Sequence, residues 1–174
     1  MRHLLFIYFL FLNITIFEGE AMASNHNGSK IYIKPTSTVN RPAYYKAMQG
    51  DNKELVNAQL SELNGGSETV RDAFIGAMTM KKAGLGGSPI TKLHLFKVGH
   101  KMLEAAIIKD PNNAEFRFLR LMIQEHAPGI LGYKNEINTD SEYIKKMYKT
   151  LPDDVQHAIT DYSKKSKYLK LGVS

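Results

Sequence analysis

Thr91–His126, TKLHLFKVGHKMLEAAIIKDPNNAEFRFLRLMIQEH, has the strongest helical periodicity of the 174-residue chain. Its spacing predicts two helices separated by Asp110-Pro111-Asn112-Asn113, because the residue before a proline is pushed out of the α region. Either asparagine is placed to cap the second helix by accepting from its free N–H groups. The apolar positions of the first helix share one half of its circumference, namely Leu93, Leu95, Phe96, Gly99, Met102, Leu103, Ala106 and Ile107.

The second helix, over residues 114–126, is apolar around most of its circumference. Its large apolar side chains cover about 220° of a helical wheel, and these are Phe116, Phe118, Leu119, Leu121, Met122 and Ile123. A helix of this kind needs neighbours on several sides, so we expect it at the centre of the domain. Glu125 lies inside the apolar arc, where a carboxylate is costly unless it is paired.

Helical patterns also occupy the rest of the chain from Asn40 onward, and no long alternating segment predicts a sheet. Asn40, Asp51 and Ser67 are the expected starts of three helices before residue 91. Thr139-x-x-Glu142 fits a capping box, and Pro152 is the expected start of the last helix. We therefore predict one all-α domain over residues 40–171, with six or seven antiparallel helices arranged as helical hairpins around the central helix 114–126.

The composition allows one sizeable core, since 43% of the residues are hydrophobic. Cysteine is absent, which excludes a disulfide scaffold, thiolate metal sites and lipid attachment through an N-terminal cysteine.

The first residues have the features of a secretory signal peptide. A basic start is followed by the apolar run Leu4–Phe17 and by Ala21-Met22-Ala23. The run is shorter than the about 20 residues of a membrane span, so we predict cleavage near Ala23 rather than an uncleaved anchor. The exported protein would be periplasmic or extracellular, and residues 24–39 would form a flexible leader.

Cleavage would remove Arg2, Glu18 and Glu20 and raise the net charge from +6 to +7. A basic exported protein favours anionic envelope components as partners, and nucleic acid is not expected there. The plainer interpretation is that lysine-rich faces solvate the helices.

Two resemblances bear on the fold. Met102–Ile107 followed by Asp110–Glu115 resembles the junction between two tetratricopeptide repeats, a family whose stacked helix pairs bind peptides or proteins, although the 34-residue period is not sustained. A second resemblance, to exported proteins of Gram-negative bacterial envelopes, implies export and a helical domain and carries over no catalytic residue. It rests on Ala73-Phe74, Met80–Gly84, Phe96–His100, Asp110–Pro128 and Asp161–Ser166.

Arg117, Arg120 and Gln124 share a polar strip of the central helix and are the best candidates for ligand binding. Their guanidinium groups suit a carboxylate or phosphate ligand. Alternatively, they pair with carboxylates or loop carbonyls of neighbouring helices. Glu125 and His100 are further candidate binding residues.

No catalytic, metal or cofactor site is predicted. His100 and Glu104 lie four residues apart without the HExxH arrangement, so a surface pair is the preferred interpretation. There is no G-x-S-x-G nucleophile motif.

The sequence thus favours a non-enzymatic protein- or peptide-binding or scaffolding module of the cell envelope. Its partner would be an envelope protein or peptide, or an anionic envelope surface, and no stable membrane span would remain after cleavage. A purely structural envelope protein fits equally well, and the oligomeric state is left open. The alternative is a small-ligand-binding protein or hydrolase using Glu125, His100, Arg117 and Arg120, which requires these side chains to converge on one pocket.

Overall fold

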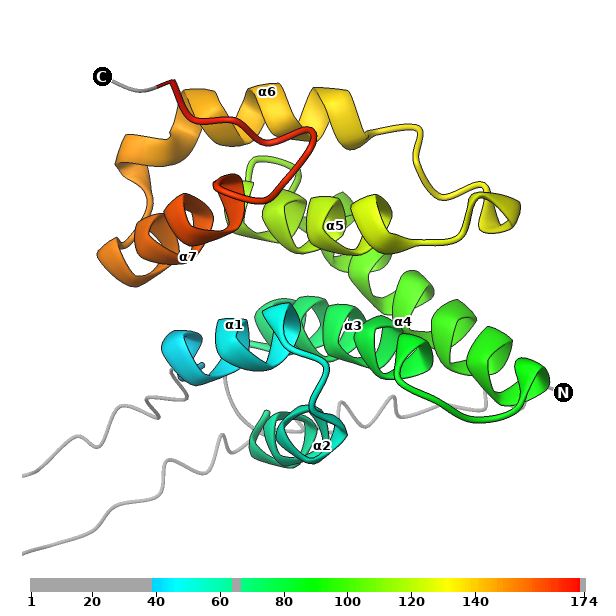
Figure 1. Cartoon of the computed structure of the whole chain (residues 1–174). Coiled ribbons are helices and arrows are strands. Elements are labelled where there is room, and N and C mark those ends of the chain that lie inside the picture. Colours follow the sequence, from blue (N-terminus) through cyan, green and yellow to red (C-terminus); the bar gives the residue numbers. More distant parts are fainter. Residues whose placement is uncertain (1–38, 64–66, 173–174) are drawn as a thin grey trace, which may run out of the picture. The chain divides into compact units, whose positions relative to one another are not determined.

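A computed structural model describes residues 39–63 and 67–172 of the chain. These residues form seven α-helices and two short 3-10 helices joined by loops, and they include no strand (Figure 1). This confirms the all-α prediction. The predicted signal peptide and nearly all of the predicted leader, residues 1–38, lie outside the described residues. The elements are α1 (Arg41–Gln49), α2 (Lys53–Glu62), α3 (Glu68–Gly84), α4 (Pro89–Lys109), α5 (Ala114–His126), η1 (Gly129–Leu131), α6 (Ile137–Met147), η2 (Tyr148–Thr150) and α7 (Asp153–Ser163).

The first five helices begin at residues whose side chains accept a backbone N–H, as N-caps do. Asn40, Ser67 and Asn113 are among them, as predicted, and Asn113 accepts from both Glu115 and Phe116. The prediction for α2 is wrong by one residue, because Asn52 caps it. Asp51 instead accepts from Lys81 Nζ at 3.0 Å.

The predicted capping box at Thr139 is also wrong. α6 begins three residues earlier than a cap at Thr139 predicts, at Ile137, and no side chain caps it. The Asp140 N–H already donates to the Glu136 carbonyl at 2.8 Å, so Thr139 lies within the first helical turn.

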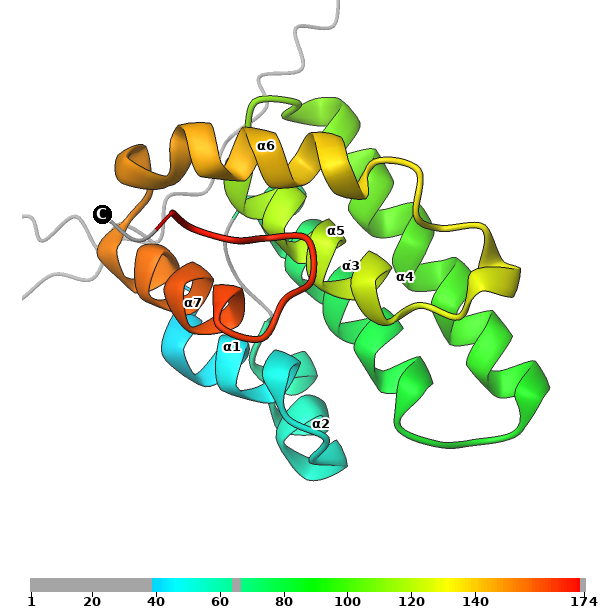
Figure 2. The same cartoon turned by 45° about the horizontal axis from the view of Figure 1, so that its top comes forward.

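α5 lies at the centre of the helices, as its wide apolar arc predicted (Figures 1 and 2). Phe118 of α5 contacts both α1 and α7, since the centre of its ring lies 5.4 Å from that of Tyr45 in α1 and 5.7 Å from that of Tyr162 in α7. The other sides of α5 pack on α3, α4 and α6. Its fully buried side chains include Phe116, Phe118, Leu119 and Leu121.

α3 and α4 form a hairpin in which the two backbones touch. A Cβ built on Gly76 would lie 2.7 Å from the carbonyl oxygen of Gly99 and 2.8 Å from the backbone nitrogen of Leu103. A Cβ on Gly99 would in turn collide with the Gly76 carbonyl oxygen and with Met80. Glycine at both positions is therefore what allows the two helices to approach so closely.

The predicted buried face of α4 is correct only for its C-terminal half. Gly99, Leu103, Ala106 and Ile107 are buried, but Leu93 is 43% exposed and Phe96 is only partly buried. The N-terminal half of α4 extends past α5 and α6, which therefore do not cover it (Figures 1 and 2).

Candidate functional site

The polar strip predicted on α5 faces α6 and contacts a buried carboxylate there. Arg120 donates from Nε to Asp140 Oδ2 at 2.7 Å and from Nη2 to Oδ1 at 2.9 Å, in a bidentate pair. The Asp140 side chain is 0% exposed and that of Arg120 is 8% exposed. Breaking such a buried pair leaves an uncompensated charge, so the pair holds α5 against α6.

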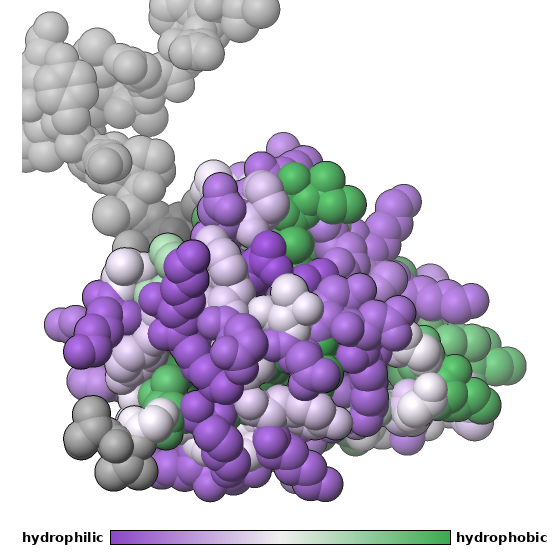
Figure 3. Space-filling view, turned by 90° about the horizontal axis from the view of Figure 1, so that it is seen from above, coloured by the Kyte–Doolittle hydropathy of each residue, from purple (hydrophilic) through white to green (hydrophobic). Residues whose placement is uncertain are grey.

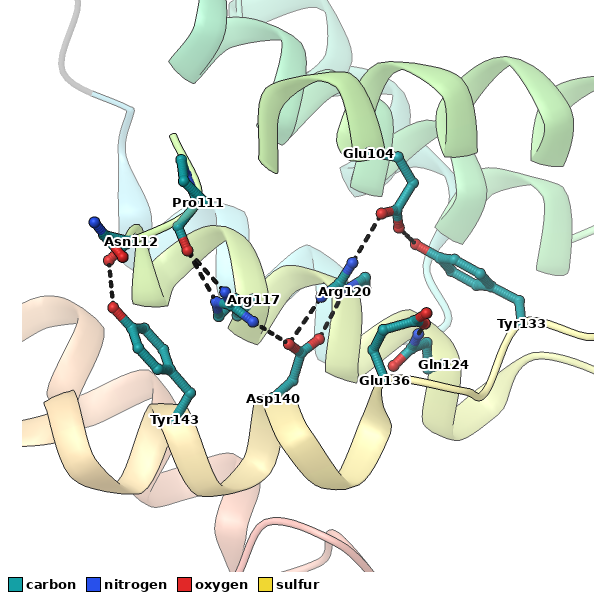
Figure 4. A network of polar contacts seen from close by, with 10 residues as sticks. All are labelled: Glu104, Pro111, Asn112, Arg117, Arg120, Gln124, Tyr133, Glu136, Asp140 and Tyr143. Carbon is teal, nitrogen blue, oxygen red and sulfur yellow. Dashed lines mark hydrogen bonds and ion pairs between the residues drawn. The ribbon is translucent and has the colours of Figure 1, made fainter. Parts of the chain in front are cut away.

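Two further residues extend this pair to neighbouring elements (Figure 4). Arg117 donates to Asp140 Oδ1 at 3.1 Å and to the Pro111 carbonyl at 2.8 Å, and its guanidinium lies 4.5 Å from the centre of the Tyr143 ring. Arg120 also donates to Glu104 Oε2 of α4 at 2.8 Å. We call Glu104, Arg117, Arg120, Tyr133 and Asp140 the arginine network.

Tyr133 completes the network by donating to Glu104 Oε1 at 2.5 Å. Burial raises the pKa of Tyr133 well above its usual range, and the neighbouring charge of Glu104 raises it further. Burial alone would lower the pKa of Arg120, but its hydrogen bond with Asp140 and the charges of Asp140 and Glu104 raise it above the usual value. Two guanidinium groups face two carboxylates, so the network is internally neutral and both arginines already bind protein acceptors.

Gln124 lies one turn beyond Arg120 on the same strip and binds a different carboxylate. Its amide nitrogen donates to Glu136 Oε2 at 3.0 Å. Its buried amide oxygen has no hydrogen-bond partner among the described residues. Gln124 is fully buried, so this free acceptor faces the packed interior rather than an open cleft.

Glu125 faces away from the arginine network and fixes the segment that follows α7. Its carboxylate accepts from the Tyr162 hydroxyl at 3.0 Å, from the Ser166 hydroxyl at 2.7 Å and from the backbone N–H of Lys167. Ser166 Oγ in turn accepts from the backbone N–H of Leu169, whose side chain is fully buried. Glu125, whose carboxylate lies inside the apolar arc of the central helix, is thus paired. Its partners belong to a chain segment that the helical pattern could not identify.

His100 lies beside the network without joining it by a hydrogen bond among the described residues. Its ring is stacked on Phe96 and lies edge-on to Tyr133, with ring centres 6.1 Å and 4.6 Å apart. The structure therefore brings Arg117 and Arg120 together on the carboxylate of Asp140 and places the His100 ring against Tyr133. Glu125 binds other residues and meets neither the two arginines nor His100. In residues 39–63 and 67–172, no group of three or more acidic or histidine side chains is placed to hold a metal ion.

A second, partly buried ion pair was not predicted from the sequence. Arg41 of α1 donates from Nε and Nη2 to the two carboxylate oxygens of Glu115 at 2.7 and 2.9 Å, and Tyr45 donates to Oε1 at 3.0 Å. An acidic residue in the first turn of a helix is common because it interacts favourably with the helix dipole, so the position of Glu115 did not indicate this partner. Glu115 also lines a pocket of about 360 Å³ with residues of the α4–α5 loop and of η2, including Asn112 and Thr150. None of the five predicted binding residues lines this pocket.

The outward face of α4 is the other notable surface. We call Ile90, Leu93, Lys97, Val98, Lys101 and Ile108 the α4 surface. Ile90 is 83% exposed and Ile108 is 78% exposed, although an aliphatic side chain stabilises a protein only when it leaves water. Helical periodicity predicted that α4 has an apolar side, but not that aliphatic side chains also occupy its outward face.

Comparison of the chain with protein-family models, curated proteins and solved structures finds no match. Among the described residues, no helix combines the length and the apolar character that crossing a membrane requires. The contacts of the described side chains are therefore the physical basis for a functional proposal.

Proposed function

We propose that the protein is an exported, non-enzymatic module that binds a protein or peptide of the cell envelope. The observation that carries this proposal is the exposure of aliphatic side chains along the α4 surface, with Ile90 and Ile108 mostly in water. Ile90, Leu93 and Val98 lie within nine residues of one helix, and exposed apolar side chains that are grouped in this way are characteristic of interaction sites. The face seen from above in Figure 3 is mostly hydrophilic, with separate apolar patches at its right edge and near its top.

The internal pairing of the charged residues supports binding over catalysis. Arg117 and Arg120 already donate to Asp140, Glu104 and the Pro111 carbonyl. A small-ligand protein or hydrolase needs its acid, base and anion-binding groups to converge on one cleft. Glu125 is instead bound to Tyr162 and Ser166, on another side of α5.

The sequence resemblance adds independent support. The segment from residue 102 to residue 115 resembles a tetratricopeptide junction, and that family uses paired helices to bind peptides or proteins. The proposal includes export, because residues 1–23 have the composition of a signal peptide.

Two measurements test the proposal. Cell fractionation and N-terminal sequencing should recover protein that begins at or near Ser24 in the envelope fraction. The purified protein should then capture a specific partner from envelope extract and bind the purified partner in a saturable way. If it captures no partner and instead turns over a small substrate, the proposal is wrong.

A further inference from the structure

The α4 surface has a defined order of apolar and charged groups along its length. Ile90 and Ile108 are eighteen residues apart in one helix, so they point in the same direction at positions about 27 Å apart. Between them, Lys97 and Lys101 point within about 20° of that direction. Along this line the surface has aliphatic ends and a cationic middle, and Leu93 and Val98 lie on its two flanks.

The lysines of α4 have no acidic partner among the described residues. Its four lysines, at positions 92, 97, 101 and 109, form no ion pair with the described residues, and its single acidic residue, Glu104, is already bound to Arg120 and Tyr133. Neighbouring like charges repel one another, and the aliphatic ends remain in water. A partner that supplies carboxylates at the middle and apolar side chains at the ends would relieve both costs.

We infer that the α4 surface docks an acidic helical segment of a partner protein, about five turns long, with carboxylates in its central turns and aliphatic side chains in its terminal turns. The inference rests on the proposed function and names the chemistry of the partner. A single helix fits because α3 covers one side of α4, and Tyr133, which lies against Phe96 and His100, covers another. From about residue 95 onward the exposed residues of α4 lie on one side of the helix, whereas residues 89–94 are exposed all around it.

Three other occupants fit this surface less well. A second copy related by a two-fold axis across the middle of α4 would place Lys97 and Lys101 against their own copies. Residues 24–39 contain Lys30 and Lys34 and no carboxylate, so they do not complement a cationic strip. A helix that lies in a membrane gathers its apolar side chains on one continuous face, whereas here lysines separate the two isoleucines.

A pair of synthetic helical peptides tests the partner chemistry. One has glutamates in the central turns and leucines in the terminal turns, and the other has the same composition with these positions exchanged. We expect the purified protein to bind the first peptide at least about tenfold more tightly, in a salt-sensitive way, since lysine–carboxylate pairs form only in that order. Binding is measured by fluorescence anisotropy of the labelled peptides.

Variants of the protein locate the site. Lys97→Glu/Lys101→Glu should weaken binding of the first peptide by about tenfold or more, and Ile90→Ser/Ile108→Ser should also weaken it, because the terminal leucines lose their contacts. The matched control is Lys146→Glu/Lys149→Glu, which changes the net charge equally at exposed lysines of α6 and η2. Circular dichroism checks that every variant is folded.

The inference is overturned if the two peptides bind equally, or if the control weakens binding as much as the α4 variants do. Binding to vesicles of phosphatidylglycerol and phosphatidylethanolamine, without binding to either peptide, overturns it in favour of a membrane surface. For the natural partner, a photo-crosslinking amino acid is placed at Val98 or at Lys146. Crosslinking through Lys146 alone overturns docking on α4 and leaves the proposed binding function intact, whereas capture of no partner contradicts the proposed function itself.

Discussion

Asp140 offers the sharpest test of what holds α4, α5 and α6 together. Asp140→Asn keeps the shape of the side chain but removes its charge and replaces one acceptor oxygen with an NH2 group. In the unchanged protein, Arg120 Nε lies 2.7 Å from Asp140 Oδ2. If the remaining oxygen of the asparagine still accepts from Arg117 and from Arg120 Nη2, its NH2 group faces the Nε–H of Arg120. One charged hydrogen bond is then lost, and two donors face each other in a site where Asp140 is 0% exposed.

The expected cost follows from this geometry. Removing one partner of a buried ion pair costs about 3–5 kcal/mol, and Glu104 still binds Arg120, so we expect a loss near the lower end, about 3 kcal/mol. That is a large share of the about 5–15 kcal/mol by which domains are stable. Urea denaturation followed by circular dichroism measures the loss.

The control lies on the same helix. Glu142 pairs with Lys145 at 2.9 Å, but the glutamate side chain is 76% exposed, so Glu142→Gln should change the free energy of unfolding by less than about 1 kcal/mol. Equal losses for Asp140→Asn and Glu142→Gln would refute the role given to the arginine network. Arg120→Met combined with Asp140→Leu should cost less than the sum of the single changes, because apolar replacement of both partners leaves no buried unpaired charge between them.

Three further perturbations test other parts of the structure. Gly99→Ala should destabilise the protein by about 1–3 kcal/mol, because the new Cβ meets the α3 backbone. Gly84→Ala is the control, since open space surrounds its Cβ and the change should be neutral or slightly stabilising. A similar urea midpoint for both variants would contradict the close approach of α3 and α4. Glu125→Ala removes the acceptor of the Lys167 N–H. The backbone amides of the segment after α7 should therefore exchange hydrogen about tenfold faster, as measured by mass spectrometry. Unchanged exchange would show that Glu125 does not hold this segment in place. Because burial raises the pKa of Tyr133 above its ordinary 10.0, the folded protein keeps a proton that the unfolded chain releases, so the free energy of unfolding should fall above pH 10 by up to about 1.4 kcal/mol per pH unit for this group. Tyr133→Phe should make that decline less steep in urea titrations at alkaline pH, and an unchanged slope would argue against the burial of its hydroxyl.

Most helices were predictable because their signals are local. Asn40, Ser67 and Asn113 cap helices through hydrogen bonds to residues two or three positions away, so the chain segment alone contains the information. Asp51 and Asn52 are both good caps, and the choice between them coincides with an ion pair to Lys81, thirty residues further on. Local sequence does not contain that competitor.

The exposed part of α4 shows a different limit of the sequence. Periodicity identifies the apolar side of a helix, but not whether a neighbouring helix is long enough to cover it. Leu93 and Leu103 belong to the same predicted apolar half of the helix, yet Leu93 is 43% exposed and Leu103 is fully buried. The cover is lost where α5 and α6 end, which depends on how separate helices align in space.

The partners of charged residues were the least predictable feature. The sequence indicated that Arg117 and Arg120 need either a ligand or neighbouring acceptors, and in the structure they contact Asp140, Glu104 and a loop carbonyl. Asp140 had no distinguishing feature, because an acidic residue near a helix N-terminus is common. Arg41 and Glu115 are 74 positions apart, and no local pattern relates them.

The contact between Gly76 and Gly99 has a consequence for how α4 meets another molecule. Where the main chains of α3 and α4 touch, no layer of side chains lies between them that could rearrange, and this opposes rolling or sliding of α4 along α3. We therefore expect the outward residues of α4 to keep their orientation before any encounter. A binding helix that is rigid in advance loses little conformational freedom on association, which favours affinity from a small contact area.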